Sequence, residues 1–403
     1  MTAATMAMPR GGNIFTARQW RGRPYLISPV ADFLMVGGLA LILIVLMAFW
    51  VPRGVINDVT ALSFSPLLAA LLTYHIFAIN YPHFAYSYQI AYRRMHYIRA
   101  ASGLRRIIRW RYAFALVIFP ILYVAYCAYA LALKEHSGLV LLGLLINLMY
   151  FTVGWHYCKQ SFGILLVLSA LKGLYFTSGE RRVLLVHAVL AWLMAWLGGN
   201  IYLFGDQFWG LPYHSAGLSR YVADWQLETF HTLGVNLTFM LGVLCAVMLV
   251  RSAYRARKFP SLTGALGYYM MYPLMLVSSV FHPLWLWVLP AMHSLQYLLF
   301  VFAYRRGEVV HMLPEQNHPS PAPSLRLHAI AGFAALGVLI GAIQFSWLPN
   351  LLDALVNPDN KLHVPLLFMA LCQLFVNIHH YFIDNVIWRR ENPEVGRYLM
   401  GRG

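Results

Sequence analysis

The chain has 403 residues, of which 60% are hydrophobic and only 11% are charged. Soluble domains are about a quarter charged, so this composition excludes an ordinary soluble domain and predicts an all-α, polytopic integral membrane protein. The net charge of +16 comes from basic residues in short loops, which favours control of topology and contact with anionic lipid over nucleic-acid binding.

Ten apolar stretches predict about ten transmembrane helices, because each is near the roughly 20 residues that cross a bilayer. In chain order they are 31–52, 60–80, 112–133, 138–158, 182–204, 229–250, 262–281, 283–304, 325–346 and 363–388. They form one membrane domain over 31–390, between a basic N-terminal segment, 1–30, and a tail, 391–403. The first stretch shows no evident cleavage site, so we interpret it as a signal-anchor helix.

Three segments between the spans have a distinct composition. Residues 84–110 are basic and amphipathic, which predicts a helix on the cytoplasmic surface. Residues 205–228 form the longest external loop, and 307–324 form a Pro-rich cytoplasmic linker. The apolar run 138–173 is long enough either for one span with an extension or for two spans.

The distribution of Lys and Arg decides the orientation. Basic residues concentrate in 93–111, in 251–258, around 305–324 and after 388, whereas few lie in 53–59, 134–137, 205–228 and 347–361. With ten spans every basic segment falls on one side, as the positive-inside rule requires, and an eleventh span within 138–173 would break this pattern. We therefore expect both termini in the cytoplasm and a multi-pass plasma-membrane protein, in the inner membrane if the source is a Gram-negative bacterium.

Seven histidines lie in apolar sequence, and this topology places them with one aspartate in the inner half of the bilayer. They are His75, His83, His156, His187, His293, His379 and His380, together with Asp384. Ionisable groups inside a membrane are costly and usually functional. Because these come from separate spans at a similar depth, we interpret all seven histidines as candidate metal ligands.

Local spacing ranks these candidates. His380 and Asp384 are four residues apart and share a helix face, so Asp384 either binds the metal or orients His380. His156 has Gln160 four residues later, and His293 has Gln296 three residues later. These two amides are candidates for holding an imidazole tautomer or contacting substrate. His187 has no such polar companion, and His379 points about 100° away from His380 on a helix.

Several imidazoles with few carboxylates suit iron, zinc or copper better than calcium or magnesium. The surrounding aromatic residues suit a hydrophobic, lipid-like substrate at an inner-leaflet site. The ligands outnumber what zinc needs, so we favour one or two iron ions and an oxygenase, hydroxylase or desaturase. No Rossmann fingerprint or P-loop is present, so electrons would come from an external electron-donor protein or from a reduced cosubstrate.

Four other interpretations remain open. Two histidines on facing helices could hold haem b for electron transfer, or one could act as the base of a metal-independent acyltransferase. A transporter with a His–Asp relay would show matching halves, and no internal repeat is visible. A purely structural membrane protein would not need the histidines. Membrane desaturases and hydroxylases share the general plan, but their HxxxH and HxxHH boxes are absent, so no residue roles are carried over from them.

Overall fold

The computed structural model describes residues 25–42, 45, 74–133, 135–203, 207–208, 211–212, 221–277, 285–312, 323–358, 364, 366–389 and 391–399. These residues are predominantly helical, which confirms the predicted all-α class. Strand pairing within these residues is limited to a two-residue antiparallel ladder between β1 (Gln207–Phe208) and β2 (Leu211–Pro212).

The described residues form twelve labelled α-helices. They are α1 (Pro29–Phe33), α4 (Tyr81–Tyr92), α5 (Arg106–Ala113), α6 (Phe119–Ala132), α7 (Glu135–Leu171), α8 (Ser178–Gly198), α9 (Asp224–Ala256), α10 (Leu262–Val277), α11 (Trp285–Met312), α12 (Pro323–Ala342), α13 (Leu348–Val356) and α14 (Leu367–Ile387). Short 3-10 turns span Met95–Ile98 and Ala100–Ser102. Wider π-helical turns span Leu34–Gly38, Ile76–Asn80, Phe114–Ile118, Gly199–Leu203, Ile343–Trp347 and Val395–Leu399.

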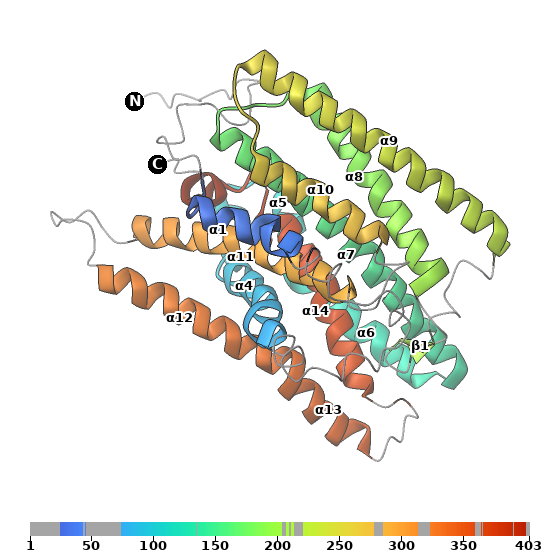
Figure 1. The fold of residues 1–403 in the computed structure, drawn as a ribbon. Coiled ribbons are helices and arrows are strands. Elements are labelled where there is room, and N and C mark those ends of the chain that lie inside the picture. The colour runs from blue at the N-terminus through green and yellow to red at the C-terminus, as the bar shows by residue number, and fades with distance from the viewer. Residues whose placement is uncertain are drawn as a thin grey trace.

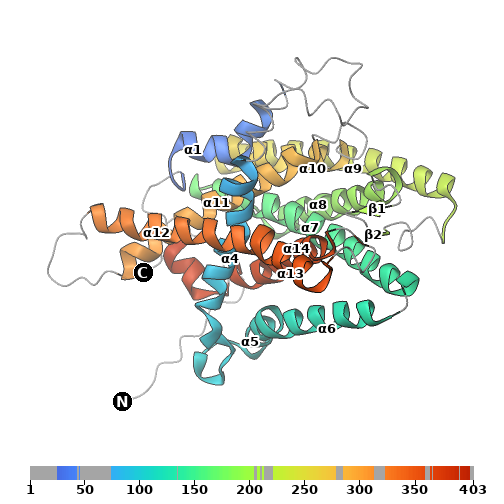
Figure 2. The same ribbon diagram turned by 90° about the horizontal axis from the view of Figure 1, so that it is seen from below.

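The helices form a broad bundle whose two edges are α9 and the α12–α13 pair (Figure 1). From the first edge inwards, α9 packs on α8, and α7 packs on both α8 and α10. From the other edge, α12 packs along α4, which contacts α14. Turned by 90°, the bundle shows α5 and α6 lying on one side of these layers (Figure 2). The centre is therefore built from α4, α7, α11 and α14.

Five helical segments of the described chain are long and apolar enough to cross a membrane. They are Arg106–Ala132, Ser137–Leu171, Ser178–Ile201, Asp224–Ala256 and Leu327–Val356. Most of the span predicted at 60–80 lies outside the described residues, as do 278–284 between α10 and α11.

The run that was open to one or two spans is one uninterrupted helix. α7 has 37 residues, and at 1.5 Å per residue it is about 55 Å long. A hydrocarbon core is about 30 Å thick, so α7 exceeds what a single perpendicular crossing needs. It contains both the predicted span 138–158 and the apolar extension that follows it.

The prediction of one amphipathic surface helix over 84–110 is wrong. Its first third belongs to α4, in which Phe84, Ser87 and Gln89 are buried. The chain then turns through two 3-10 segments, and α5 begins at Arg106. Basic residues after Tyr92 dominate the composition of 84–110. The buried helix at the start of this segment was therefore not recognised from the sequence.

Three of the π-helical turns precede a proline. The turns at Ile76–Asn80, Phe114–Ile118 and Ile343–Trp347 are followed by Pro82, Pro120 and Pro349. Proline lacks an amide donor and its ring crowds the carbonyl four residues earlier, and a widened turn relieves both effects. The helix therefore continues through Pro82 into α4, and His83 enters the core on this helix.

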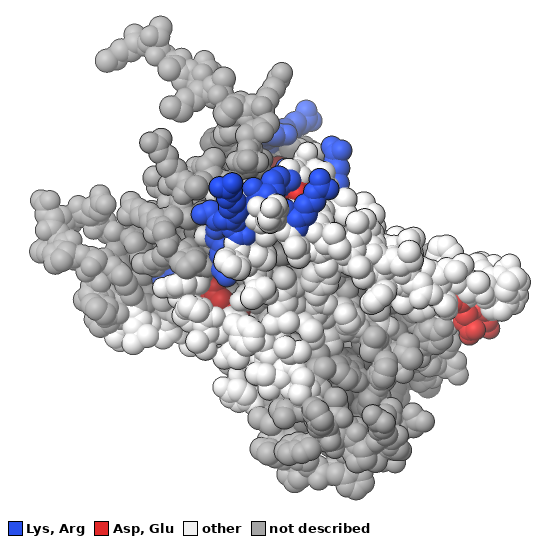
Figure 3. Space-filling model, turned by 45° about the horizontal axis from the view of Figure 1, so that its top comes forward, with Lys and Arg blue, Asp and Glu red and all other residues white. Residues whose placement is uncertain are grey.

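Basic side chains gather at one end of the bundle. The start of α8 meets the end of α9 there, where Glu180 accepts from Ser252 at 2.6 Å and pairs with Arg255 at 2.9 Å. Exposed cations at this end include Lys172, Arg182, Arg251, Arg257 and Lys258. Figure 3 shows blue side chains gathered at this end of the visible face with a few acidic ones among them, and a further acidic group at the far end.

A buried ionic network links two connecting segments of the chain. Arg94 pairs with Glu394 and also donates to the hydroxyl of Tyr304. Tyr97 donates to Glu394 at 2.6 Å, and burial together with this hydrogen bond raises the pKa of Tyr97. The segment after α4 is thereby tied to the segment after α14.

Candidate metal centre

Four helices each bring one histidine to the centre of the bundle. His83 comes from α4, His156 from α7, His293 from α11 and His380 from α14, and all four are buried. Their ring centroids form a closed four-membered arrangement with neighbouring separations of 5.2, 5.0, 4.7 and 4.9 Å. The diagonal from His293 to His380 is 6.1 Å.

The ligand atoms of these residues converge in two overlapping groups. The first group is His83, His293 and His380, and the second is His156, His380 and Asp384. Within each group the candidate ligand atoms all lie within 4.8 Å of one another. His380 belongs to both groups, so the arrangement offers either one centre with several donors or two adjacent centres.

Six buried polar atoms of this cluster have no hydrogen-bond partner in the described part of the chain. They are Nε2 of His83, His156 and His380, both ring nitrogens of His293, and Oδ2 of Asp384. A buried polar atom left without a partner costs about 1–3 kcal/mol, and whole domains are stable by only about 5–15 kcal/mol. Unpartnered atoms that converge in the two groups are therefore expected to bind a ligand.

Hydrogen bonds fix the tautomer of His380. Ser87 Oγ donates to Asp384 Oδ1 at 3.0 Å, and Ser87 Oγ is 2.8 Å from His380 Nδ1. With Asp384 ionised, as a metal-bound carboxylate is, Ser87 donates either to it or to Tyr297 and accepts from the Nδ1–H of His380. Nε2 of His380 then carries a lone pair and is free to bind a metal.

The same reasoning applies to His83. Its Nδ1 lies against the backbone carbonyl of Asn80, which can only accept, so Nδ1 carries the proton. Ser294 Oγ is 3.0 Å from this nitrogen and donates to Asn80 Oδ1 at 3.0 Å. The free lone pair of His83 is therefore on Nε2, the atom that faces the other histidines.

Asp384 connects two of the imidazoles. Its Oδ2 lies 3.4 Å from His156 Nε2 and 3.5 Å from His380 Nε2. Neither contact has the geometry of a hydrogen bond. Its Oδ1 also accepts from the hydroxyl of Tyr297 at 3.0 Å. One carboxylate oxygen is thus held by hydroxyl groups, and the other is left facing the histidines.

Three of the seven predicted histidine ligands lie apart from this cluster. His379 accepts from Tyr88 Oη at Nδ1 (2.8 Å) and donates from Nε2 to the carbonyl of Ala115 (2.7 Å), so both nitrogens are in use. His187 bonds Tyr268 Oη at 2.8 Å between α8 and α10. His75 is partly buried and belongs to neither group. The geometry thus does not support these three as ligands.

Both predicted amides bind other protein groups rather than the imidazole rings. Gln160 Nε2 donates to the carbonyl of His293 at 3.0 Å and to Gln296 Oε1 at 3.1 Å. Gln296 Nε2 donates to the carbonyl of Val36 at 2.6 Å. They link α7, α11 and the first π-helical turn, and Gln160 acts on His293 only through its backbone.

Ser87, Ser294 and Tyr297 are site residues that sequence reasoning missed. Ser87 lay in the segment interpreted as a surface helix, and Tyr297 was counted only as part of the aromatic surroundings. Ser294 follows His293 directly and Tyr297 follows Gln296 directly, which is the one sequence signal that could have found them. Their role depends on contacts with distant helices, which spacing within one helix cannot reveal.

The spacing of the four imidazole rings is compatible with metal ligation, with the candidate ligand atoms converging in two groups of three. Metal–nitrogen bonds of about 2.1 Å place the centroids of neighbouring imidazoles roughly 4.5–5.5 Å apart around one ion. All four neighbouring separations fall in this range. Tyr157 stacks on His293 with centroids 4.2 Å apart, which restrains that ring although its nitrogens have no partners in the described chain.

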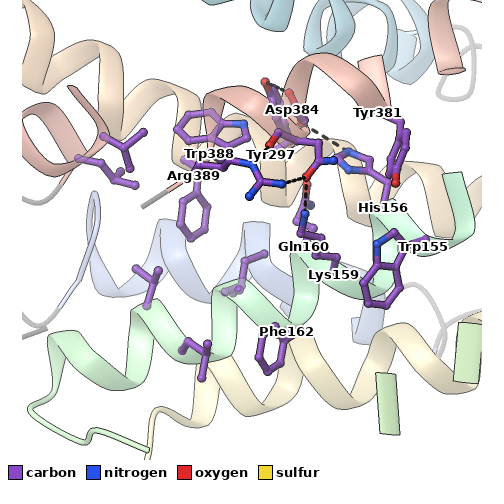
Figure 4. A pocket seen from close by; sticks show the side chains of 18 of the residues that line it. Trp155, His156, Lys159, Gln160, Phe162, Tyr297, Tyr381, Asp384, Trp388 and Arg389 are labelled. Carbon is purple, nitrogen blue, oxygen red and sulfur yellow. Dashed lines mark hydrogen bonds and ion pairs between the residues drawn. The ribbon is translucent and has the colours of Figure 1, made fainter. Parts of the chain in front are cut away.

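A cavity of about 550 Å³ opens beside this cluster. His156, Asp384 and Tyr297 line one part of its wall, and Gln160, Lys159 and Arg389 lie further along (Figure 4). The remaining wall is largely apolar and comes from α7, α11 and the stretch after α14; it includes Phe162, Ile164, Leu166, Val167, Phe300, Val395 and Leu399. A molecule in this cavity would therefore touch two of the candidate ligands.

Comparison with known proteins gives no family for this chain. No protein-family model, curated protein or solved structure matches it. The functional argument therefore rests on the site itself.

Proposed function

We propose that the protein is a membrane-embedded, histidine-ligated metal oxidoreductase, specifically a non-haem iron oxygenase acting on a hydrophobic substrate. One observation carries this proposal. Ligand atoms from four helices, without partners in the described chain, converge beside a largely apolar cavity that His156 and Asp384 help to line.

Iron is favoured by the donor set that faces the cavity. His156, His380 and Asp384 form a group of two histidines and one carboxylate, which is typical of non-haem iron oxygenases. Structural zinc sites use four ligands and catalytic ones three, whereas five donors lie together here. Whether one iron or two bind depends on how His380 is shared between the two groups.

The arrangement of the rings argues against haem b. A haem held by two histidines needs the space between the two rings for its flat porphyrin. Here the pair His293 and His380 is 6.1 Å apart, but His83 and His156 occupy the space around that axis. Each lies within 5.2 Å of both members of the pair, so a macrocycle would collide with them.

The residues of the chain would hold, orient and shield the reacting groups. When bound, iron would supply the activation of dioxygen. In the overall hydroxylation a C–H bond and dioxygen give C–OH and water, with two electrons and two protons from an external electron-donor protein. Ser87 and Tyr297 hold Asp384 in place, and the apolar walls of the cavity exclude water from the substrate chain.

We further propose ten membrane spans with both termini in the cytoplasm, in a plasma membrane. The concentration of basic residues at one end of the bundle supports this orientation. His380 and Asp384 lie in the last turns of α14, immediately before Arg389, so the site would lie in the cytoplasmic half of the bilayer. Substrate would then enter from the inner leaflet.

Elemental analysis of the purified protein tests the metal assignment. We expect one or two equivalents of iron in the wild type and severe loss in His156→Ala and His380→Ala. When one ligand is removed, the metal ion keeps too few bonds to the protein to stay bound. His187→Gln is the matched control, since His187 is a buried membrane histidine outside the cluster, and it should retain the wild-type metal content.

Two outcomes would overturn the proposal. Substoichiometric content of every transition metal in the wild type would remove the metal site itself. Stoichiometric zinc without iron would keep the site but reject oxygenase chemistry in favour of hydrolysis by activated water.

A further inference from the structure

Two cations in the cavity wall lie close to the metal centre. Lys159 follows His156 by three residues on α7, which advances about 4.5 Å along the helix. Arg389 follows α14 just after Asp384 and Asn385. Lys159 is exposed and Arg389 is partly buried, and both line the cavity.

A single neutral acceptor holds both cations. Asn385 Oδ1 accepts from Lys159 Nζ at 2.7 Å and from Arg389 Nη2 at 3.1 Å (Figure 4). Arg389 Nε also donates to the backbone carbonyl of Asn385 at 2.7 Å. The ammonium has two further N–H groups and the guanidinium three, so the pair retains donors for a ligand.

Negative charge near this pair is scarce. Neither cation forms an ion pair within the described part of the chain. Asp384 faces the histidines, and Glu391, which also lines the cavity, is exposed. Burial, and after it the neighbouring Arg111, lowers the pKa of Arg389, and the carboxylate of Glu391 opposes this in part.

The rest of the cavity is apolar and of limited size. Its volume of about 550 Å³ lies in the range that encloses one drug-sized molecule. It suits a single-chain amphiphile better than a phospholipid with two acyl chains. A planar carboxylate also matches the fork of donors on an arginine.

We propose that the cavity binds a long-chain carboxylate whose headgroup is held by Lys159 and Arg389. The chain lies along the apolar wall formed by Phe162, Val167 and Phe300. Binding of the carboxylate does not depend on the proposed function, but the site of oxidation does. The anchor would place the carbons nearest the carboxylate beside His156 and Asp384. Oxidation would therefore occur near the headgroup and not at the far end of the chain.

Equilibrium binding of radiolabelled palmitate to the purified protein in detergent tests the proposal. The matched long-chain alcohol and methyl ester serve as uncharged ligands. We expect palmitate to bind at least about tenfold more tightly than either, since hydrogen bonds to charged groups contribute about 1.5–3 kcal/mol. Lys159→Gln and Arg389→Gln should each lose about tenfold in palmitate affinity, by the same magnitude.

Two further variants separate loss of the anchor from loss of the fold. Lys172→Gln removes an exposed cation after the same helix, outside the cavity, and should bind palmitate normally. Gly163 lines the cavity, and a Cβ built there meets no atom within 4 Å. Gly163→Leu should therefore occupy the cavity, abolish binding and leave iron content and thermal stability intact.

The outcomes distinguish this inference from the proposed function. Equal binding of palmitate, alcohol and ester would overturn the carboxylate site, as would tighter binding of a long-chain phosphate monoester. Undiminished palmitate binding in Lys159→Gln/Arg389→Gln would do the same. Iron content measured on the same samples tests the metal centre separately, so either proposal can fail while the other stands.

Discussion

At the scale of single residues, the small side chain of Ser87 contacts several groups of the site at once. Its hydroxyl is within hydrogen-bonding distance of Tyr297, His380 and Asp384. It sets the tautomer of one candidate ligand and holds the carboxylate of another. Groups that support ligands in this way typically change metal affinity by about 10–100-fold when removed.

Replacing Ser87 by alanine should weaken iron binding by about 10–100-fold while the protein remains folded. The Nδ1–H of His380 would lose its acceptor, and Asp384 would keep only the hydrogen bond from Tyr297. Competition with a chelator of known affinity measures the change. Ser252→Ala, which removes a buried hydroxyl beside Glu180, should leave iron affinity unaltered; equal affinities in both variants would contradict this role of Ser87.

At the scale of elements, the contact between α4 and α12 positions two site residues. α4 carries His83 and Ser87, and α12 lies along it. The contact is close because α12 presents glycines: a Cβ at Gly337 would lie 2.1 Å from the ring of Tyr86, and one at Gly341 would lie 2.9 Å from the backbone of Tyr81. Small residues are what allow membrane helices to pack this closely.

Gly341→Ala should lower the stability of the protein by about 1–3 kcal/mol, the usual cost of overpacking. The clash is with the backbone of Tyr81, which cannot rotate away, so α12 must shift from α4. Thermal unfolding in detergent measures the effect. Gly332→Ala on the same helix meets no atom within 4 Å and should unfold at the wild-type temperature; indistinguishable midpoints would show that the close contact does not limit stability.

The sequence predicted relations within one helix but not contacts between helices. Periodic spacing within one helix correctly grouped His380 with Asp384 and separated His379 from them, because both relations follow from helix geometry alone. It could not show that His187 packs between α8 and α10, since that depends on which helices are neighbours. The core position of α4 was missed because Arg93, Arg94 and Arg99 dominate the composition that follows it.

At the scale of the whole molecule, charge is unevenly distributed from end to end. The cations after α7, at the start of α8 and after α9 share one end of the bundle, and the candidate metal centre lies on helices that run towards it. This asymmetry is the property that fixes orientation in a membrane. It was predictable from the sequence because it depends only on which segments lie between apolar stretches.

A reporter fused after Gly403 should read as cytoplasmic. One inserted directly after Leu133, between α6 and α7, should read as external. Alkaline phosphatase is active only outside and the fluorescent protein only in the cytoplasm, so the two kinds of fusion check each other. Two fusions reading on the same side would contradict the proposed number of spans, and an external C-terminus would reverse the proposed depth of the histidines.

The distribution of the four histidines over four helices also constrains biosynthesis. His83 and His380 come from helices far apart in the sequence, so a nascent chain holds the first ligand long before the last helix is inserted. A complete donor set exists only after α14 has reached its place between α4 and α7. Metal would therefore enter after membrane insertion, and its binding energy would favour the assembled bundle over partly inserted chains.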